Sequence, residues 1–304
     1  MSSQFPDEQG DDGSFARQED AFRDWIEESA KARFPSEAGR YHLYVSFACP
    51  WAHRIIAMRV LKGLQSAVGM TAVDPIRDDK GWRFTDAPDC GPDPINGFQY
   101  LSEAYRANDP DYRGRVTVPV LWDKKQGRIV SNSDDDLLRM LNSRFSRFAK
   151  NDHDFYPSRL ANEIDELNEL IYETVNNGVY KAGFASTQAA YEEAVYPLFD
   201  TLDKLEERLD KRGPYLFGEY MTETDWRLWV TLLRFDPVYH GHFKCNLRQI
   251  AQYPNLHDFA RRLAAMDGIG DTIKLDHIKR HYYMTHEEIN PSRIVPVGPR
   301  YSIG

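Results

Sequence analysis

The sequence predicts an α/β region followed by an all-α region, within a chain of 304 residues. In residues 41–145, short apolar runs rich in β-branched and aromatic residues alternate with stretches of helical periodicity. In residues 155–285, apolar residues recur at a spacing near 3.6. Residues 1–40 form an N-terminal extension that is disordered in its first part (1–14), and residues 286–304 form an extended, proline-containing tail.

The composition is ordinary for a soluble globular protein and argues against several other classes of protein. Hydrophobic residues make up 41% of the chain and charged residues 28%, and the net charge is −9. That charge disfavours binding to nucleic acid or to an anionic membrane, and no apolar run is long enough to span a bilayer. The first residues are too polar for a signal peptide, and three cysteines do not make a disulfide framework. We therefore expect a cytoplasmic protein.

The stretch around Cys49 joins a strand directly to a helix. Residues 43–48 are an apolar run typical of a buried strand, and the helix that follows ends at Gly63. Because proline favours the first helical position, Pro50 places Cys49 at the N-cap. Unpaired N–H groups and the positive end of the helix dipole there favour thiolate and lower the pKa of the thiol. The pattern predicts a nucleophilic sulfur.

A lone cysteine is more often a small buried apolar residue, but its place at the end of an element argues against that role for Cys49. Ala52 stands where the second cysteine of a redox Cys-x-x-Cys motif would be. Cys49 therefore has no local partner for a disulfide, and a mixed disulfide on it requires an external thiol.

The remainder of the α/β region follows in order. We expect a short helix within 15–34, a strand over 68–76, a long loop over 77–97 ordered by Trp82, a helix over 98–108, a strand over 114–123, its hairpin partner over 128–132 and a helix over 134–142. Pro119 interrupts a strand-like run, which makes the Val118–Pro119 bond a candidate cis peptide. Ser131 to Ser133 offer N-cap chemistry for the helix that follows.

The all-α region contains helical patterns over 157–176, 187–211, 222–235, 254–265 and 268–281. Thr222 to Asp225 reads as a capping box in which the carboxylate accepts backbone N–H bonds.

This order of elements is thioredoxin-like in its first half. With Val118-Pro119 and the cap at Thr222–Asp225, it resembles the glutathione transferase architecture, an N-terminal thioredoxin-like domain followed by a C-terminal helical domain. Longer motifs resemble the Xi class of that superfamily, the glutathionyl-hydroquinone reductases. They cover nearly the whole chain after residue 15 and comprise Ser46–Arg54, Gly81–Trp82, Gly114–Asp123, Asn176–Phe184, Arg234–Tyr239, His242–Cys245 and Asp276–Tyr282.

The resemblance implies a reaction and a site. In that family a cysteine attacks the sulfur of a thiol–hydroquinone conjugate, the hydroquinone leaves, and a second thiol releases the enzyme. Cys49 matches this nucleophile. Trp82, Arg115, Val118 and Pro119 match residues that bind the thiol, and Tyr180 and Tyr282 match phenols that hydrogen-bond the hydroquinone oxygens and stabilise developing charge.

Simpler interpretations exist for several of these residues. Trp82 would also serve as an anchor for its loop, and Pro119 as a trans proline on an edge strand. Without the motifs, Tyr180 and Tyr282 would count among 17 mostly half-buried tyrosines.

The start of the helix at 134 departs from the family pattern. The family has Glu-Ser where this chain has Ser133-Asp134, so the acid has moved by one residue. An anionic Asp134 would repel the ligand carboxylate that the family serine accepts. Either Asp134 takes over the amine of glutathione in a shifted pose, or the co-substrate is another low-molecular-weight thiol such as mycothiol, whose hydroxyls suit Asp and Ser.

The sequence thus predicts a thiol-dependent reductase acting on hydroquinone conjugates, without bound metal or nucleotide, since it has neither a ligand cluster nor a glycine-rich phosphate loop. The resemblance implies a homodimer. Two alternatives are an omega-like general disulfide or dehydroascorbate reductase that uses the same cysteine, and a non-catalytic binding protein that keeps the fold.

Overall fold

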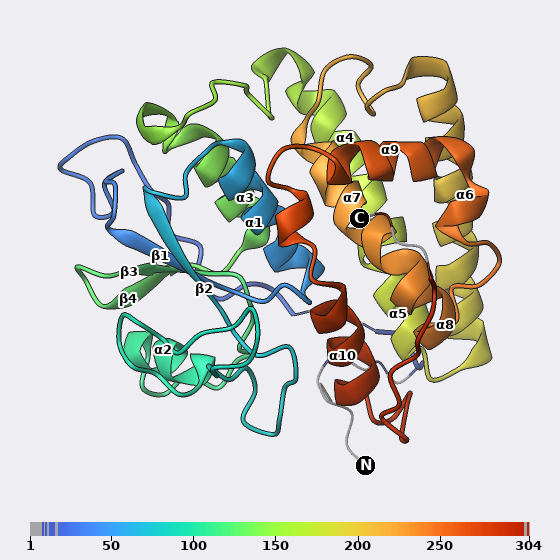
Figure 1. Ribbon diagram of the computed structural model, residues 1–304, viewed down its shortest axis with the longest axis horizontal. Helices are drawn as coiled ribbons and strands as arrows, with labels where there is room; N and C mark the ends of the chain where they lie inside the picture. The colour runs from blue at the N-terminus through green and yellow to red at the C-terminus, as the bar shows by residue number, and fades with distance from the viewer. Residues whose placement is uncertain (1–7, 9, 11, 16–17, 301–302, 304) are drawn as a thin grey trace. The chain divides into compact units, whose positions relative to one another are not determined.

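The structure is a computed structural model that describes residues 8, 10, 12–15, 18–300 and 303 (Figure 1). The chain divides into two compact units. The α/β unit comprises Glu19–Asp154 and Asp271–His281, and the helical unit comprises Met1–Gln18, Phe155–Gly270 and Tyr282–Gly304. Most of the predicted disordered stretch (residues 1–7, 9 and 11) lies outside the described residues.

The α/β unit is built on one four-stranded mixed sheet. Its elements are β1 (Tyr41–Val45), α1 (Pro50–Leu61), β2 (Val68–Ala72), α2 (Leu101–Asn108), β3 (Val120–Asp123), β4 (Arg128–Ser131) and α3 (Asp134–Ser143). The strand order is β2-β1-β3-β4, with β1 parallel to β2 and antiparallel to β3. Helices α1 and α3 pack together on one face and α2 covers the other (Figure 1). The predicted thioredoxin-like order is confirmed.

The predicted helix within residues 15–34 is wrong for the part that the structure describes. Residues 18–34 are extended or turning, and Arg23 bridges Ser131 of β4 in antiparallel fashion. The backbone N–H of Asp24 donates to the carbonyl of Val130 at 3.1 Å. The open edge of β4 therefore offers this segment hydrogen bonds that a helix would have made internally. Its apolar Ile26 is fully buried without helical periodicity.

The long segment that connects β2 to α2 has little regular structure, as predicted, and buried carboxylates organise it. Asp93, 5% exposed, accepts hydrogen bonds from the hydroxyl of Tyr44 at 2.8 Å and from the backbone N–H groups of Ile95 and Asn96 at 3.0 Å. Asp74 accepts from Ile76 N at 2.9 Å and from the Thr85 hydroxyl at 2.9 Å. These bonds fix both ends of the loop that carries Trp82.

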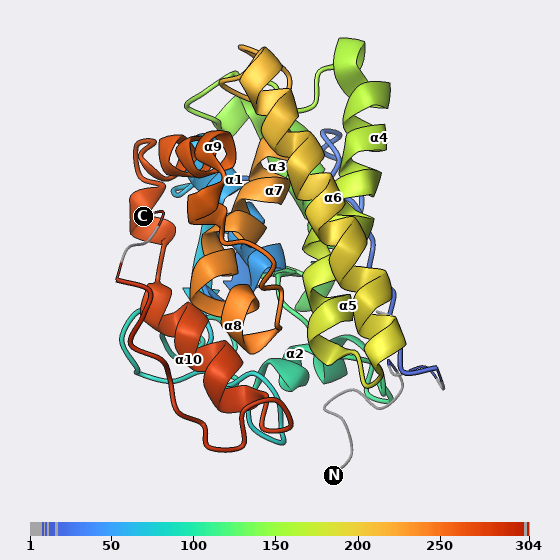
Figure 2. The same cartoon turned by 90° about the vertical axis from the view of Figure 1, so that its right-hand side faces the viewer.

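The helical unit follows the predicted periodicity with corrections at its boundaries. Its helices are α4 (Ala161–Ile171), α5 (Gly178–Phe184), α6 (Gln188–Arg212), α7 (Glu223–Arg234), α8 (His240–His242) and α9 (Pro254–Ala264). Figure 2 shows the long α6 running beside α5. The predicted 157–176 helix is split, because residues 172–176 form a π turn, and α5 was not predicted as a separate helix. A second π turn spans 235–239.

Helix α10 (Leu275–Thr285) begins later than the predicted residue 268. Gly268 has φ +72°, which no right-handed helix accommodates, and residues 270–272 make only a single 3₁₀ turn. Residues up to His281 belong to the α/β unit and those from Tyr282 onward to the helical unit.

The start of α7 is confirmed as a capping box. Asp225 accepts hydrogen bonds from the backbone N–H groups of Thr222 at 2.7 Å and Leu216 at 2.8 Å. All residues of α7 are buried, so this cap fixes the central helix of the unit.

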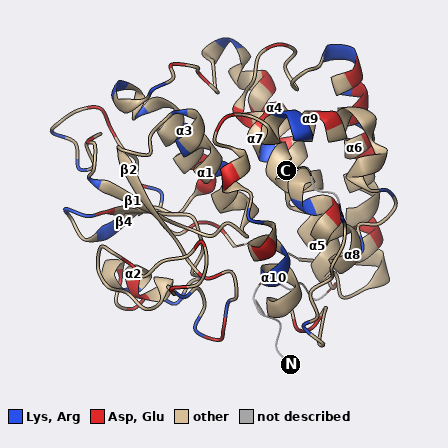
Figure 3. Cartoon of the chain, in the orientation of Figure 1, with Lys and Arg blue, Asp and Glu red and all other residues tan. Residues whose placement is uncertain are grey.

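The charged residues are spread over the chain, as its mixed composition predicts. Lysine and arginine are interspersed with aspartate and glutamate along the elements of both units (Figure 3). Within the described part of the chain, no helix combines the length and apolarity that crossing a membrane requires.

Candidate active site

Cys49 lies where the sequence predicts it, as the N-cap of α1 and directly followed by Pro50. Its backbone is extended, with φ −76° and ψ 123°, and no acidic residue stands in the first turn of the helix. The side chain is 8% exposed, and its Sγ lies 3.6 Å from the carbonyl oxygen of Val118. The sulfur is thus placed at the positive end of a helix, beside the peptide that precedes Pro119.

The other two cysteines lie in surroundings that disfavour thiolate. Burial raises the pKa of the Cys90 thiol to about 11, and it raises the pKa of the fully buried Cys245 further. Both thiols therefore stay protonated at neutral pH. Cys49 is the cysteine whose position favours nucleophilic chemistry.

The Val118–Pro119 peptide bond is cis, as predicted. Val118 is 4% exposed, and its backbone N–H makes no hydrogen bond with any residue that the structure describes. The peptide next to Cys49 therefore keeps a donor with which an extended ligand backbone can pair.

The N-terminus of α3 is acidic and is matched by a buried arginine from α1. Ser133 is the N-cap and accepts from the backbone N–H of Asp136 at 3.4 Å. Arg54, 1% exposed, forms ion pairs with Asp134 at 3.0 Å and with Asp135 at 3.5 Å. This cation offsets the negative charge that the sequence places at the helix start. Asp134 is therefore one member of an ion pair with Arg54.

Trp82 is 4% exposed and lies against two cationic or aromatic side chains. The imidazole of His281 stacks on its indole with ring centroids 5.0 Å apart and planes inclined by 19°. The guanidinium of Arg77 lies 5.2 Å from the ring centroid. The indole N–H donates no hydrogen bond to any described residue, so this donor is available. Arg115 is half-buried, and its carbonyl accepts from the hydroxyl of Tyr112 at 2.7 Å.

Residues 271–281 contact Trp82 and residues next to Cys49, and the sequence did not predict these contacts. Thr272 Oγ1 lies 2.8 Å from Nε2 of His53, and His53 stands in the first turn of α1 after Cys49. The ring of His277 lies 5.9 Å from that of Phe47, two residues before Cys49. The Asp276–Tyr282 motif was the available signal, but only its last residue carries a role in the family resemblance.

Tyr180 and Tyr282, both in the helical unit, are brought together. Their hydroxyl oxygens are 2.5 Å apart, and the hydroxyl of Tyr239 lies 2.9 Å from that of Tyr282. Tyr239 was missed as a site residue, although it ends the Arg234–Tyr239 motif. Burial raises the pKa of Tyr239 and of Tyr282 well above the usual value. These phenols stay protonated and can donate hydrogen bonds.

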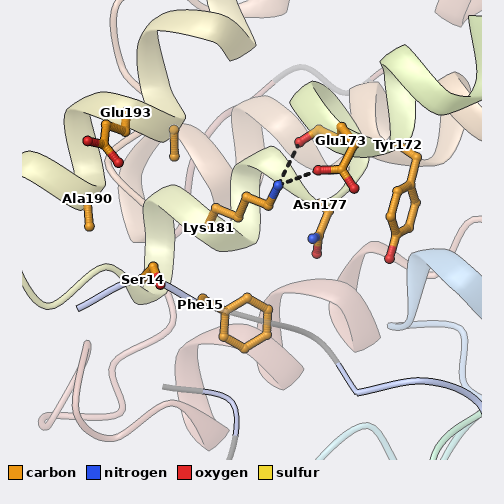
Figure 4. A pocket seen from close by; sticks show the side chains of 9 residues that line it. Ser14, Phe15, Tyr172, Glu173, Asn177, Lys181, Ala190 and Glu193 are labelled. Atoms are coloured by element: carbon orange, nitrogen blue, oxygen red, sulfur yellow. Dashed lines mark hydrogen bonds and ion pairs between the residues drawn. The ribbon is translucent and has the colours of Figure 1, made fainter. Parts of the chain in front are cut away.

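A separate cleft of about 520 Å³ opens in the helical unit (Figure 4). An ion pair between Lys181 Nζ and Glu173 Oε2, 2.5 Å long, crosses one wall, and Phe15 lies on another. The lining comprises Ser14, Phe15, Tyr172, Glu173, Asn177, Lys181, Ala190, Glu193 and Ala194. None of the predicted site residues lines this cleft. The cleft is therefore not the predicted reaction site.

Comparison with known protein families identifies the superfamily to which the chain belongs. The N-terminal domain of glutathione S-transferases matches residues 48–144, and the C-terminal domain matches residues 188–262. These matches and the fold define the chain as a glutathione transferase in class.

Individual relatives narrow the assignment. The chain is 51% identical over 287 residues to "Glutathionyl-hydroquinone reductase PcpF" of Sphingobium chlorophenolicum, covering 94% of this chain and 90% of PcpF. The crystal structure of glutathione-S-transferase Xi from Phanerochaete chrysosporium superimposes with a TM-score of 0.93 at 50% identity, covering 96% and 95% of the two chains. The glutathione-bound structure of YqjG from Escherichia coli K-12 gives a TM-score of 0.89 at 47% identity, covering 93% and 94%. The chain belongs to the Xi class, the glutathionyl-hydroquinone reductase family.

Proposed function

We propose that this protein is a thiol-dependent reductase that removes glutathione from glutathionyl-hydroquinones through a mixed disulfide on Cys49. The observation that carries the proposal is the position of Cys49, which caps α1 beside Val118 and has Ala52 where a resolving cysteine would stand. The relatives named as glutathionyl-hydroquinone reductases supply the substrate class.

The reaction balances in two steps. In the first, the Cys49 thiolate attacks the sulfur of the conjugate, a sulfur–sulfur bond forms, and the carbon–sulfur bond breaks with its electron pair on the ring carbon. A proton delivered to that carbon completes the free hydroquinone. In the second, an external thiolate attacks the mixed disulfide, which frees the Cys49 thiolate and forms the disulfide of the small thiol. The external thiol is the reductant, and ping-pong kinetics follow.

Residues of the α/β unit hold the thiol moiety. The backbone N–H of Val118, next to cis Pro119, has no partner among the described residues and is suited to pair with the ligand backbone, and the indole of Trp82 packs on the ligand. Ser133 and Asp134 at the start of α3, together with Arg115, bind its polar ends. The phenols of Tyr180 and Tyr282, joined by Tyr239, donate to the hydroquinone oxygens and stabilise the developing negative charge.

Glutathione is the co-substrate that the relatives favour, because YqjG was solved with glutathione bound. Ser133-Asp134 leaves mycothiol as the second candidate, since carboxylate and hydroxyl oxygens accept bonds from sugar hydroxyls. The direct comparison is the rate of thiol removal and the binding affinity with glutathione, γ-glutamylcysteine and mycothiol. Saturation by mycothiol alone would replace glutathione in the proposal without changing the reaction.

The test of the function is hydroquinone release from a glutathionyl-hydroquinone by the purified protein and by Cys49→Ser. We expect parallel double-reciprocal plots for the wild type and complete loss in the variant, with its circular dichroism unchanged. A variant that kept its rate would refute the proposal. Alkylation of Cys49 against pH separates an enzyme from a binding protein, because a non-catalytic protein would show an unactivated thiol.

Homodimer assembly and a cytoplasmic location complete the proposal. The three free cysteines suit a reducing compartment. Sedimentation equilibrium of the purified chain tests the dimer, and a monomer across the micromolar range would contradict it.

A further inference from the structure

His281 is the aromatic partner of Trp82 in the α/β unit. Its imidazole lies nearly parallel to the indole, at 5.0 Å and 19°, and both side chains are buried, at 8% and 4% exposure. The two residues are about 200 positions apart in the sequence, so nothing local brings them together. The stack is a tertiary contact made by α10 on the loop that carries Trp82.

The imidazole is itself held in place. His281 Nδ1 lies 2.6 Å from the carbonyl oxygen of Pro75, and because a carbonyl only accepts, Nδ1 carries the proton. One turn earlier on α10, His277 Nε2 lies 2.8 Å from the carbonyl oxygen of Pro88. The two histidines therefore bind the Trp82 loop on either side of the tryptophan, but only His281 touches the indole.

We propose that His281 is a positioning residue that holds the Trp82 indole in the orientation that binds the thiol. The proposal rests on the proposed function, in which Trp82 packs on that thiol. Trp82 lies in a segment with little regular structure, and its N–H has no partner among the described residues. Without the stack, the side chain would have to be ordered when the ligand binds, at a cost in affinity.

A ligand-free measurement tests the positioning. Protein labelled with 5-fluorotryptophan gives six fluorine resonances, since the chain has six tryptophans, and Trp82→Phe assigns one of them. We expect His281→Ala to broaden or split the Trp82 resonance alone, and His281→Phe, which keeps a flat ring, to restore most of its sharpness. His277→Ala, on the same helix and the same loop, is the matched control and should leave it sharp. An unchanged resonance in His281→Ala overturns the proposal.

The second arm tests whether positioning serves the thiol. We expect His281→Ala to raise KM for glutathione in the resolving step about 10-fold while kcat changes less than about twofold, which is the signature of lost binding. In a double-mutant cycle with Trp82→Ala, the His281 effect should disappear, because it acts through the indole. Equal effects of His281→Ala and His277→Ala, or additive effects in the cycle, would show general ordering of the loop and contradict the proposal. Loss of activity in Cys49→Ser with no effect of His281→Ala would refute the positioning role and leave the function intact.

Discussion

At the residue scale, a short contact in the helical unit joins two hydroxyl groups that the proposed reaction uses. The 2.5 Å separation of the Tyr180 and Tyr282 oxygens, extended by Tyr239 at 2.9 Å, makes a chain of buried phenols. Burial keeps Tyr239 and Tyr282 protonated because it raises the pKa of each. A chain of this kind donates protons to an electron-rich oxygen and polarises its own members.

The first prediction concerns these phenols. Replacing Tyr180 and Tyr282 together by phenylalanine should lower kcat for hydroquinone release by about 10²-fold, the usual cost of losing such donors. Reduction of a small mixed disulfide by the same protein should be nearly unchanged, because no ring charge develops. Tyr283→Phe is the control, since that hydroxyl bonds the carbonyl of Pro237 at 3.3 Å instead. Equal loss in both assays would favour a general disulfide reductase.

The second prediction concerns Asp134, whose carboxylate is 3.0 Å from the Arg54 guanidinium. If this carboxylate holds the ligand amine, Asp134→Asn should raise KM for glutathione by about 10-fold, since a hydrogen bond to a charged group is worth 1.5–3 kcal/mol. Asp135→Asn is the matched control, because Asp135 is the more exposed partner of the same arginine. A lower KM in Asp134→Asn would reveal repulsion of a ligand carboxylate and would favour mycothiol.

At the element scale, the cap of α7 carries the clearest prediction of stability. Asp225 is fully buried and accepts two backbone N–H bonds, so Asp225→Ala should cost about 2–4 kcal/mol in unfolding free energy. Urea denaturation of the wild type and the variant measures this difference. A cost below about 0.5 kcal/mol, the range typical of surface substitutions, would contradict the role of the cap.

Asp225 also has a pH signature. Burial is the largest influence on the carboxyl and raises its pKa from 3.8 to about 6, against the hydrogen bonds that favour the charged form. The folded state therefore binds the proton more tightly than the unfolded state does. The stability contributed by this group is complete below about pH 4 and is lost as the pH rises toward 6. Asp225→Asn does not titrate, so the variant should lack this contribution to the pH dependence of the unfolding free energy. The same pH dependence in the wild type and the variant would contradict the raised pKa of Asp225.

Elements with local signals were predictable, and those set by tertiary contacts were not. Pro50 fixed the start of α1, and Thr222 with Asp225 fixed that of α7, because the chemistry of each cap lies within four residues. The segment around Arg23 was predicted as a helix, since the free edge of β4 that it pairs with is invisible to periodicity. The π turns at 172–176 and 235–239 likewise have no signature in apolar spacing.

At the scale of the whole molecule, two buried histidines predict how the protein responds to acid. Burial lowers the pKa of His42 in β1 and of His242 in the helical unit from 6.5 to about 4. Both stay neutral in the folded protein while the unfolded chain binds protons. Stability should therefore fall as the pH drops from about 6.5 to 4, by up to about 1.4 kcal/mol per pH unit for each histidine.

Thermal unfolding followed between pH 7 and 4.5 measures this trend. The two histidines act in the direction opposite to Asp225 and outnumber it, so the midpoint should fall on acidification. His42→Gln should reduce the dependence of the unfolding midpoint on pH, because glutamine does not titrate. The amide can still bond the Thr71 hydroxyl that lies 2.8 Å from His42 Nε2, so the packing is kept. A midpoint that stays constant or rises would contradict the buried neutral state.

The same distinction between local and distant information governs the site. Cys49, Trp82 and Val118 each stand in a short sequence motif, from which they are predicted as site residues. Thr272, His277 and His281 reach the surroundings of Cys49 and Trp82 from the far end of the chain, and no local pattern assigns them a partner. The sequence indicated that an anionic Asp134 would repel a ligand carboxylate, but it did not show the buried Arg54 that pairs with Asp134 in the structure.

The most direct measurement is the intact mass of the protein after it is mixed with an equimolar glutathionyl-hydroquinone in the absence of free thiol. The account predicts one glutathionyl group per chain, located on the peptide that contains Cys49, and one free hydroquinone released for each. Cys49→Ser should carry no adduct and release nothing. Hydroquinone release without an adduct, or an adduct on Cys90 or Cys245 instead, would contradict the account.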